Sequence, residues 1–422
     1  MYPRHVSDLL MESAQDSPVI LLNGARQTGK STLIQRLLVD GHKARYITLD
    51  DADFLRAAKN DPGGFIAGWD GPLVIDEVQR VPELFMAIKA SVDRDRRPGR
   101  FFLTGSANIL LLPQMAEFLT GRMEIHTLQP LSQGELEKQK EAFIDAVFNP
   151  QFSLFNTRFS EGVPLTERIT RGGFPEAVGR TVPRRRSAWF HAYITTLLQR
   201  DVRDIADVNG LTLLPKLLSL LATRVSSLLN FSELARSSQI PETTLKRYLT
   251  ILETAFLTFR LPPWSTNLGK RLVKTPKIFL TDTGLAVHLL GLGPSSLSTD
   301  HPFIGPLLEN FVVSELIKQA SWSHTHPTLY HFRTSAGCEV DILLEDARGH
   351  CVGIEVKCGK TVGPRDVQGL KSLSEMAGKK FVRGIILYAG QDTIPFAQNI
   401  HALPLPALWQ MNAHGVSQNT LQ

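Results

Sequence analysis

The stretch from Gly24 to Ser31 has the residue types and spacing of a loop that binds phosphate. It reads GARQTGKS, which is Gly-x-x-x-x-Gly-Lys-Ser. Glycines let a backbone turn so tightly that consecutive N–H groups point at phosphate oxygens, and a following helix adds the positive end of its dipole. In such a loop Lys30 contacts the outer phosphates and Ser31 ligates Mg²⁺. We expect ATP contacts from Gly24, Ala25, Arg26, Gln27, Thr28, Gly29, Lys30, Ser31 and Thr32.

Two adjacent acids, Asp76 and Glu77, follow an apolar run in GPLVIDEVQ. Asp76 has the position of an acid that helps to hold Mg²⁺, and Glu77 that of a residue that polarises the attacking water. Two hydroxyl residues after a later strand, Thr104 and Ser106, are placed either to hold that water or to cap a turn. The sequence therefore predicts hydrolysis of the bound nucleotide, with Lys30, Glu77 and Ser106 as catalytic residues.

A third group of residues that could take part in catalysis or metal binding lies in VDILLEDARGHCVGIEVK, from Val340 to Lys357. If this is a hairpin, Asp341 lies opposite Glu355, with Lys357 on the same face. Opposed carboxylates repel, and a bound cation such as Mg²⁺ relieves the repulsion. Two further acids, Glu309 and Glu315, lie upstream in a segment with helical spacing. The competing interpretation is a hairpin in which Lys357 only neutralises the acids.

Secondary structure must position these groups. The phosphate loop follows an apolar run suited to a buried strand and precedes apolar residues at helical spacing. The segments ARYITLDD, LVID, RFFLTGSAN and MEIHTLQPLS add four strands, separated by helical segments that include ANILLLPQMAEFLT. Strands alternating with helices indicate a doubly wound parallel sheet, which binds ligands at the carboxyl ends of its strands.

Composition and length restrict the class of protein. At 422 residues, with 43% hydrophobic and 21% charged residues, the chain is long enough for about three globular domains. It has no apolar run of the roughly 18 residues that a membrane span needs. Its three cysteines do not form a disulfide or zinc pattern. We expect a cytoplasmic protein without a membrane partner.

The middle of the chain is helical and then predicts a winged helix. In NFSELARSSQIPETTLKRYL we expect Ser232 to cap a short helix and Pro241 to begin a longer one. The exposed face of the second helix would carry Thr243, Thr244, Lys246 and Arg247. The region from Ala255 to Thr281 has no acid and contains five cations, Arg260, Lys270, Arg271, Lys274 and Lys277. This favours DNA as a partner, although such modules also contact proteins.

These motifs together resemble the AAA+ ATPases, in particular the family whose AAA_14-type core precedes a C-terminal domain of unknown function, DUF4143. The matching segments include GARQTGKST, LVIDEVQRVPELF, LTGRMEIHTLQPLS and RGGFPEAV. The resemblance implies that Arg122 acts in trans on a neighbour's nucleotide in a homo-oligomer, unless it is only a surface arginine. GGFP is similar to the lid motif of signal-transducing NTPases, which implies that Gly173 and Pro175 lie near the adenine. Otherwise Pro175 only breaks a helix.

The C-terminal motif residues Glu309, Asp341, Glu355 and Lys357 resemble those of PD-(D/E)XK nucleases, a fold that also has inactive copies. The resemblance implies that Asp341, Glu355 and Lys357 are catalytic and that Glu309 is a metal ligand with the two other acids, with Glu315 as the alternative to Glu309. The expected fold is α/β, with an AAA+ core in residues 1–135, a helical lid and linker in 136–220, a winged helix in 221–298 and a nuclease-like domain in 299–410. The expected function is Mg²⁺-dependent ATP hydrolysis coupled to DNA binding and to metal-dependent DNA cleavage. The alternative is a nucleotide-switched DNA-binding or scaffold protein with an inactive nuclease-like domain.

Overall fold

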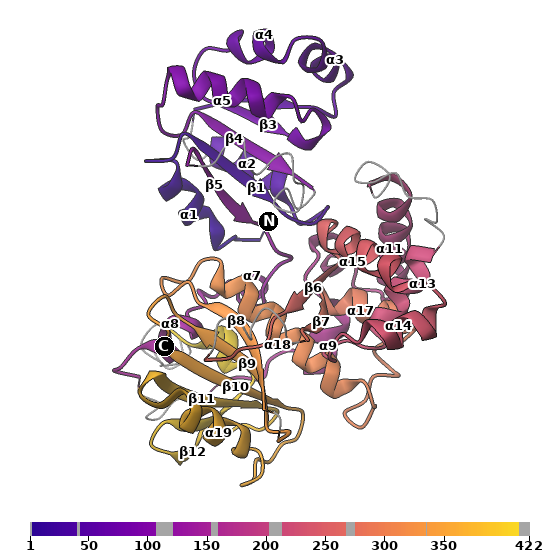
Figure 1. Cartoon of the computed structure of the whole chain (residues 1–422), viewed down its shortest axis with the longest axis vertical. Helices are drawn as coiled ribbons and strands as arrows, with labels where there is room; N and C mark the ends of the chain where they lie inside the picture. Colours follow the sequence, from indigo (N-terminus) through magenta and orange to yellow (C-terminus); the bar gives the residue numbers. More distant parts are fainter. Residues whose placement is uncertain are drawn as a thin grey trace.

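The computed structural model describes residues 2–39, 43–106, 121–152, 159–201, 213–266, 275–334 and 336–412. Figure 1 shows an N-terminal body built on one sheet and a larger second body that holds the rest of the chain. Within these residues, no helix combines the length and the apolar character that crossing a membrane requires. The expected helix ANILLLPQMAEFLT lies outside the described residues.

The N-terminal body contains the predicted parallel sheet, with strand order β2-β3-β4-β1-β5. Its strands are β1 (Val19–Asn23), β2 (Arg45–Thr48), β3 (Leu73–Asp76), β4 (Phe101–Gly105) and β5 (Met123–Thr127), and all neighbours pair in parallel. β1 is buried throughout because it lies between β4 and β5. The loop that follows β1 therefore starts from the interior of the sheet.

Helices cover both faces of this sheet, as the alternation of side chains in β1 requires. Ile20 and Leu22 pack with residues of α1 (Val6–Ser13) and α2 (Lys30–Val39). Val19 and Leu21 belong to a second cluster. That cluster is covered by α3 (Ala52–Asn60), α4 (Pro62–Ala67), the short η1 (Val78–Arg80) and α5 (Leu84–Arg94). The period of two follows from strand geometry.

The helices of the predicted helical segment after the sheet pack in two places, some against the C-terminal sheet and others against each other. Its helices are α7 (Gln133–Glu137), α8 (Phe143–Phe148), α9 (Leu165–Arg171), α10 (Pro175–Val178), α11 (Pro183–Thr196) and the π-helix η3 (Leu197–Asp201). α8 packs against the C-terminal sheet and its long helix, whereas α10 and α11 pack on each other. A ring cluster of Phe174, Trp189, Phe190 and Tyr193 joins the last two.

The winged-helix pattern is present in α13 (Leu213–Ala222), α14 (Phe231–Ser238), α15 (Glu242–Thr254) and the antiparallel strands β6 (Thr258–Leu261) and β7 (Lys277–Leu280), followed by α17 (Thr283–Leu289). One prediction is corrected. Asn230, rather than Ser232, caps α14, because its side chain accepts from the backbone of Glu233. Pro241 lies at the cap position immediately before α15. The expected wing residues Lys270, Arg271 and Lys274 lie outside the described residues.

The C-terminal sheet has six strands in the order β12-β13-β11-β10-β9-β8. These are β8 (Thr328–Arg333), β9 (Glu339–Glu345), β10 (Cys351–Lys357), β11 (Phe381–Tyr388), β12 (Ile394–Ala397) and β13 (Ile400–Pro404). The other elements are α18 (Ile304–Ala320), α19 (Gln368–Ala377), η4 (Gly378–Lys380) and α20 (Ala407–Gln410). The predicted hairpin is confirmed, since Cys351 pairs with Glu345 and Ile354 with Ile342.

One hydrophobic cluster runs through the whole second body. It includes Phe143 of α8, Phe174 beside the lid, Leu249 of α15, Phe311 of α18 and Ile354 of β10. A separate cluster lies on the other face of the C-terminal sheet, under α19. The lid, winged helix and C-terminal sheet therefore share a core, while the N-terminal sheet has its own.

Candidate functional site

The loop after β1 has the backbone shape that the sequence predicts for phosphate binding. Gly24 has φ of 141° and Gly29 φ of 94°, both in the region that favours glycine. A side chain at Gly24 is excluded because its Cβ would lie 2.4 Å from the Leu128 carbonyl oxygen. α2 begins directly after the loop, at Lys30. The loop and a helix N-terminus thus form one continuous cradle for an anion.

Lys30 lies across this loop rather than in solvent. Its Nζ donates to the carbonyl oxygens of Gly24 and Ala25, both at 2.9 Å, and the residue is 5% exposed. The buried Thr28 hydroxyl also donates to the Ala25 carbonyl at 2.9 Å. These contacts hold a positive charge against the concave side of the loop.

Ser31 and Asp76 meet at the carboxyl ends of the strands, as their assignment to one Mg²⁺ requires. The Ser31 hydroxyl is 3.0 Å from each carboxylate oxygen of Asp76. Asp76 also accepts from the Tyr46 hydroxyl at 2.8 Å and from the Thr104 hydroxyl. Burial, and then the hydrogen bond to Asp76, raise the pKa of Tyr46, so its hydroxyl stays a donor. The carboxylate is therefore fixed by three neighbouring elements.

Glu77 is held in an unusual backbone conformation beside Asp76. Its φ of 59° and ψ of 43° are left-handed, which is uncommon for a residue with a side chain. Its backbone N–H donates to the Thr104 hydroxyl at 3.1 Å, and its carboxylate accepts from the Ser106 hydroxyl at 2.7 and 2.9 Å. Gln79 donates to the same carboxylate. Thr104 and Ser106 thus orient the two acids.

A cavity of about 1060 Å³ lies beside the phosphate loop, between the two bodies. It is lined by Thr28, Gly29 and Thr32 of the loop and α2, and also by Pro175 of the lid. The structure therefore places Pro175 on the same cavity as Thr28 and Gly29, and the contact of Pro175 with adenine stays a prediction. Trp322 of the C-terminal part also contributes to the wall.

Two sets of contacts attach the phosphate loop to its surroundings. Arg4 donates from Nη1 to the Thr28 carbonyl at 2.7 Å and from Nη2 to the Gln129 carbonyl at 2.6 Å. Its Nε is 3.1 Å from a carboxylate oxygen of Glu135, in α7. From the lid, the Tyr193 hydroxyl is 3.5 Å from the Arg26 carbonyl oxygen. These contacts connect the phosphate loop to α7 through Arg4 and to α11 through Tyr193.

The lid turn that carries Pro175 is fixed by backbone contacts. The Gly173 N–H donates to Asp282 at 2.6 Å, and its carbonyl accepts from the Leu131 N–H at 2.7 Å. A side chain at Gly173 would lie 2.4 Å from the Leu131 carbonyl oxygen. Gly173 therefore joins the linker after the N-terminal sheet to the winged-helix region.

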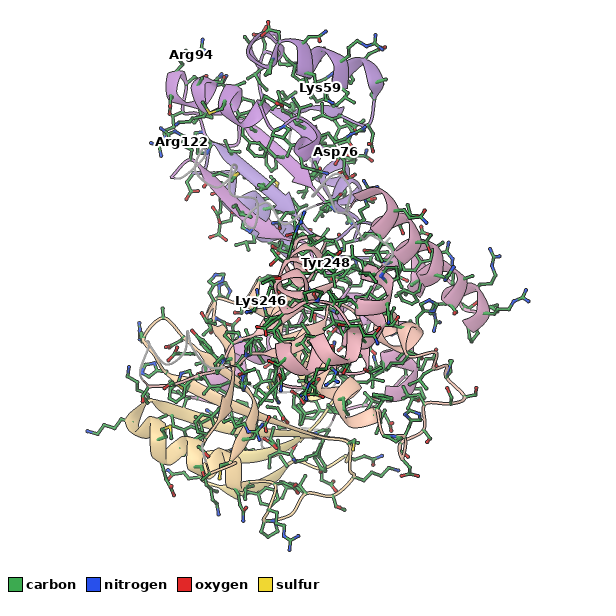
Figure 2. The ribbon with its side chains drawn as sticks, turned by 45° about the vertical axis from the view of Figure 1, so that its right-hand side comes forward. Lys59, Asp76, Arg94, Arg122, Lys246 and Tyr248 are labelled. Atoms are coloured by element: carbon green, nitrogen blue, oxygen red, sulfur yellow. The ribbon has the colours of Figure 1, made fainter. Side chains whose placement is uncertain are left out.

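Arg122 lies at the opposite end of the strands from the phosphate loop. It immediately precedes β5, whose first residue pairs with the first residue of β1, whereas the loop follows the last residue of β1. Its Nε is 2.5 Å from a carboxylate oxygen of Asp93. Figure 2 shows Arg122 and Asp76 on different sides of the N-terminal body. Arg122 cannot reach its own chain's nucleotide site, so its catalytic role stays a prediction for contacts between chains.

The residues around the loop fit Mg²⁺ and a nucleotide triphosphate. Mg²⁺ in such sites takes one or two protein oxygens, together with phosphate oxygens and water. Ser31 and Asp76 supply these oxygens, and the positive φ of Gly24 and Gly29 gives the loop a shape suited to phosphate.

Two acids that the sequence predicts as metal ligands, Glu309 and Asp341, surround Lys277, a lysine of the winged-helix region. The Lys277 Nζ is 2.9 Å from a Glu309 oxygen, 2.7 Å from a Glu339 oxygen and 3.7 Å from an Asp341 oxygen. The Lys277 side chain is 4% exposed. Lys277 is one of the five cations that suggested a DNA phosphate backbone as partner, and this expectation is wrong for Lys277, because a buried and ion-paired ammonium is not available to phosphates. We call Glu309, Glu339, Asp341 and Lys277 the acidic cluster.

Burial and charge shift the pKa values in the acidic cluster. Burial disfavours the ammonium of Lys277, but the carboxylates of Glu309, Asp341 and Glu339 together raise its pKa, so it stays charged. Burial, followed by the charge of Asp341, raises the pKa of Glu309 to about 8. Burial also raises the pKa of Asp341. The pKa of Glu339 is lowered, because the hydrogen bond and charge of Lys277 together outweigh burial.

A β-bulge separates Asp341 from the direct pairing that we expected. The register of β8 against β9 shifts, so that His331 faces both Asp341 and Ile342. The pairing of β9 with β10 ends at Ile342 and Ile354, and Asp341 is not paired directly with Glu355. The sequence could not show this bulge, because it depends on the third strand.

Glu355 and Lys357 form a separate ion pair next to the acidic cluster. Lys357 Nζ is 2.8 Å from Glu355 and 3.8 Å from Asp366, while Asp341 accepts from the Val356 N–H at 2.9 Å. Burial, and then the charge of Asp341, raise the pKa of Glu355 to about 7. In the described part of the chain, no group of three or more His, Cys, Asp or Glu residues is arranged to hold a metal ion. These acids therefore do not fit a metal centre as they stand, and we derive no cleavage step from them.

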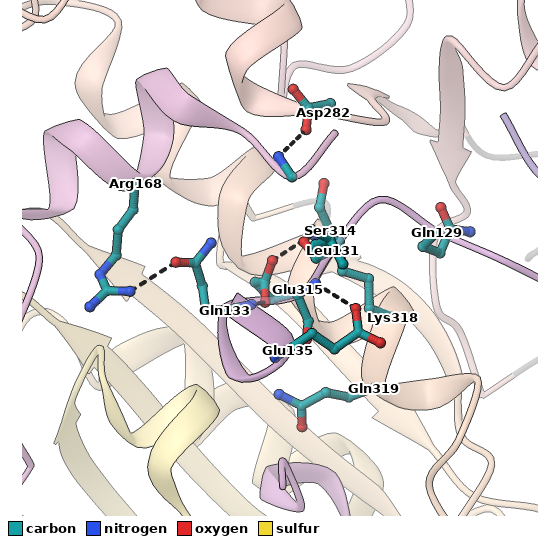
Figure 3. Close-up of polar contacts among 12 residues, drawn as sticks. Gln129, Leu131, Gln133, Glu135, Arg168, Asp282, Ser314, Glu315, Lys318 and Gln319 are labelled. Atoms are coloured by element: carbon teal, nitrogen blue, oxygen red, sulfur yellow. Dashed lines mark hydrogen bonds and ion pairs between the residues drawn. The ribbon is translucent and has the colours of Figure 1, made fainter. Parts of the chain in front are cut away.

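Glu315, the alternative acid, lies in a different network. Its carboxylate is 2.6 Å from Lys318 Nζ and accepts from the Gln133 N–H at 2.8 Å. Lys318 also donates to the Leu131 carbonyl at 3.0 Å (Figure 3). Glu309 lies six residues earlier in α18, and it is the acid that, together with Asp341, contacts the Lys277 ammonium. α18 thus contacts the linker with one part and the acidic cluster with another.

The cationic surface of the winged helix is smaller than the sequence suggests. The Arg260 guanidinium forms a bidentate ion pair with Glu253, at 2.6 and 2.8 Å, and is therefore not directed to a DNA phosphate. On α15, Lys246 and Arg247 are exposed, as predicted, and Lys246 Nζ lies 2.8 Å from a carboxylate oxygen of the partly exposed Glu242. The side of the second body that carries α15 and Lys246 faces the N-terminal body (Figures 1 and 2).

Known proteins resemble this chain over nearly all of its length. A protein of Mycobacterium bovis and one of Mycobacterium tuberculosis, both called uncharacterized, are each 30% identical to it over 402 residues, which are 95% of this chain and 83% of the relative. The chain belongs to their family. A Haemophilus influenzae protein, also called uncharacterized, is 28% identical over 255 residues, 58% of this chain and 57% of that protein.

Three family models divide this family member into consecutive regions. An AAA domain matches residues 16–137, a domain of unknown function (DUF8612) matches 164–296, and a domain of unknown function (DUF4143) matches 304–408. The fold is that of an AAA-type P-loop ATPase joined to a separate C-terminal sheet. A branch migration motor structure from Thermotoga maritima aligns with 61% of this chain and 87% of its own, at 18% identity and a TM-score of 0.29.

Sequence reasoning missed several residues that shape the sites of this AAA-type protein. Arg4 precedes the sheet and belongs to no motif, although it contacts the phosphate loop. The sequence pattern places Tyr46 in a strand but does not indicate that its hydroxyl donates to Asp76. Glu339 was not singled out, although an acid two residues before Asp341 in a strand is a usable signal.

Proposed function

We propose that the protein is a Mg²⁺-dependent ATPase whose nucleotide state controls DNA binding by its winged helix. The contact of Ser31 with Asp76, beside Lys30 and Glu77, is the observation that carries the proposal. A serine hydroxyl and a carboxylate at 3.0 Å, next to a glycine cradle, are what one Mg²⁺ and a triphosphate need. Asp76 alone would equally suit a structural role, but a loop of this backbone shape that leads directly into a helix is suited to binding phosphate.

The protein residues contribute mainly by positioning and electrostatics. The loop amides and Lys30 bind phosphate oxygens and offset the charge that develops there. Ser31 and Asp76 hold the metal ion, which when bound neutralises phosphate charge. Glu77 accepts a hydrogen bond from the attacking water and orients it, and Ser106 fixes the Glu77 carboxylate. Thr104 contacts both Asp76 and the backbone of Glu77, so the acid that holds the metal ion and the acid that orients water keep a fixed relative position.

The base of the nucleotide would lie in the cavity beside the loop. Pro175 supplies an apolar wall from the lid, and the N-terminal segment around Arg4 supplies the other side. Because the cavity is lined by both bodies, bound nucleotide contacts each of them. We propose that this is how nucleotide state reaches the winged helix, with Arg122 acting on a neighbouring subunit in a homo-oligomer.

The experiment measures ATP hydrolysis with and without DNA for the wild type and for Glu77→Gln. We expect Glu77→Gln to retain ATP binding and to lose about 100-fold or more of the hydrolysis rate, because an oriented acid–base group contributes about 10²–10⁴. Glu83→Gln is the matched control, since Glu83 is exposed and its side chain makes no capping contact. We expect DNA to change the wild-type rate. Hydrolysis by Glu77→Gln at the wild-type rate would refute the assignment of Glu77, and a rate indifferent to DNA would refute the coupling.

A further inference from the structure

The acidic cluster joins two parts of the chain that belong to different sequence regions. Lys277 begins β7 of the winged helix, whereas Glu309 lies in α18, and Glu339 and Asp341 lie in β9. One ammonium therefore contacts three carboxylates from two elements of the C-terminal part. Arg333 adds a more distant contact, 4.0 Å from Glu339.

The position of Lys277 is set by its backbone and does not depend on the flexible side chain alone. Lys277 pairs with Leu261 across β6 and β7 and forms an isolated bridge with Leu228. Three residues later, the Leu280 N–H donates to the Asn310 side chain at 2.8 Å, and the Leu280 carbonyl accepts from it at 2.9 Å. Asn310 is the neighbour of Glu309 and is fully buried. β7 and α18 are therefore held in one register, which directs Lys277 toward Glu309.

The spacing within the cluster is that of hydrogen bonds to an ammonium. Two carboxylate oxygens lie 2.7 and 2.9 Å from Lys277 Nζ. Mg²⁺ requires oxygens at about 2.0–2.1 Å in an octahedral arrangement. A metal ion shared by Glu309 and Asp341 would have to occupy the space between them, where the ammonium lies.

We propose that Lys277 is the resident cation of the acidic cluster and takes the place of a divalent metal ion between Glu309 and Asp341. It follows that the C-terminal sheet, as it is attached to the winged helix, does not bind Mg²⁺ or Mn²⁺ through these acids. The resemblance to a nuclease then reflects the fold and the acids, with the metal replaced by a side chain from another region. This inference is independent of ATP hydrolysis, because no residue of the phosphate loop takes part.

The test measures Mn²⁺ binding to nucleotide-free protein by electron paramagnetic resonance. Four proteins are compared: wild type, Asp341→Asn, Lys277→Met and the double variant Lys277→Met with Asp341→Asn. The wild type and Asp341→Asn should bind the same amount of Mn²⁺. Lys277→Met should gain one site, and the double variant should lose it again. Lys371→Met, at an exposed position of α19, is the control and should gain none.

Two outcomes would overturn the proposal. One is Mn²⁺ binding by the wild type that disappears in Asp341→Asn. The other is a folded Lys277→Met protein that gains no site. If Lys277→Met does not fold, the comparison of wild type with Asp341→Asn still decides, and acetylation of the wild type gives a second measurement. The buried Lys277 amine should stay protected in millimolar Mn²⁺, and an increase in its labelling with Mn²⁺ would show that the metal displaces it.

Discussion

Asp76 shows how single residues define the nucleotide site. Its carboxylate accepts from hydroxyls of α2, β2 and β4, so that Ser31, Tyr46 and Thr104 converge on one group. Three of these four positions, Ser31, Asp76 and Thr104, follow from local sequence, since the loop and the strand ends carry recognisable patterns. The Tyr46 contact does not, because it requires β2 and β3 to be neighbours.

His331 provides a residue-scale prediction on pH. It is 2% exposed, and burial, followed by the charge of Lys277, lowers its pKa to about 4. Its Nε2 lies 3.1 Å from the Thr275 carbonyl oxygen, to which it must donate. Glu339 and Arg333 are the other charged groups that act on it. The unfolded chain binds a proton near the ordinary pKa of 6.5, whereas the folded chain does not until about 4, so stability falls as the pH drops through this window.

The measurement is urea unfolding at about pH 7.5 and about pH 5, for which His331 alone is expected to remove about 2 kcal/mol. Buried carboxyls titrate in the same range with the opposite effect, so the comparison is between wild type and His331→Gln. Glutamine keeps a donor for Thr275 and should remove this part of the pH dependence. His324→Gln, at an exposed position, should leave it unchanged. The same pH dependence in wild type and His331→Gln would contradict the prediction.

The elements of the fold follow from the sequence better than their contacts do. The five parallel strands, the helix pair of the winged helix and the β9–β10 hairpin all have local hydrophobic periodicity. Three features do not. The cap of α14 was placed two residues too late, the bulge of β9 is imposed by β8, and the burial of Lys277 depends on α18. Each depends on a partner that is distant in sequence, which periodicity does not encode.

α15 carries an element-scale prediction about DNA. Its exposed residues Lys246 and Arg247 lie at helix positions that a second helix of this motif uses to approach a duplex. Reversing both charges, as Lys246→Glu with Arg247→Glu, should weaken DNA binding about tenfold or more and reduce the salt slope by about 1–2.

Lys216→Glu is the matched control, because Lys216 is exposed on α13, away from this face. The measurement is fluorescence anisotropy of a labelled duplex across a series of salt concentrations. Equal affinity and equal salt slope for the double variant and the wild type would exclude α15 as the DNA-binding face. Intact ATP hydrolysis in the variant would show that the effect is confined to the second body.

At the scale of the whole molecule, a buried ion pair of the second body contacts the linker that follows the N-terminal sheet. Lys318 and Glu315 of α18 contact the linker at Leu131 and Gln133, just after the N-terminal sheet (Figure 3). Lys318→Met would leave the Glu315 carboxylate buried without its cation, which destabilises by about 3–5 kcal/mol in comparable pairs. We expect the second body to unfold at a lower temperature while the N-terminal body unfolds as before.

Differential scanning calorimetry distinguishes these transitions, with ATP added to identify the nucleotide-binding body by its stabilisation. Lys216→Met is the control, since it removes an exposed charge of the second body. A Lys318→Met protein with the wild-type profile would show that this ion pair does not stabilise the second body.

The packing of α8 has a consequence for how the chain is made. Phe143, Ile144 and Val147 are fully buried, and their helix packs on α18 and β11. Arg383 of β11 donates to the Val147 carbonyl across 236 residues of sequence. During synthesis from the N-terminus, this apolar helix leaves the ribosome long before its partners exist, so a nascent chain carries an uncovered apolar surface until the last strands have emerged. The N-terminal body can fold in the meantime, and we expect the chain to be most prone to aggregation in the interval between the two events.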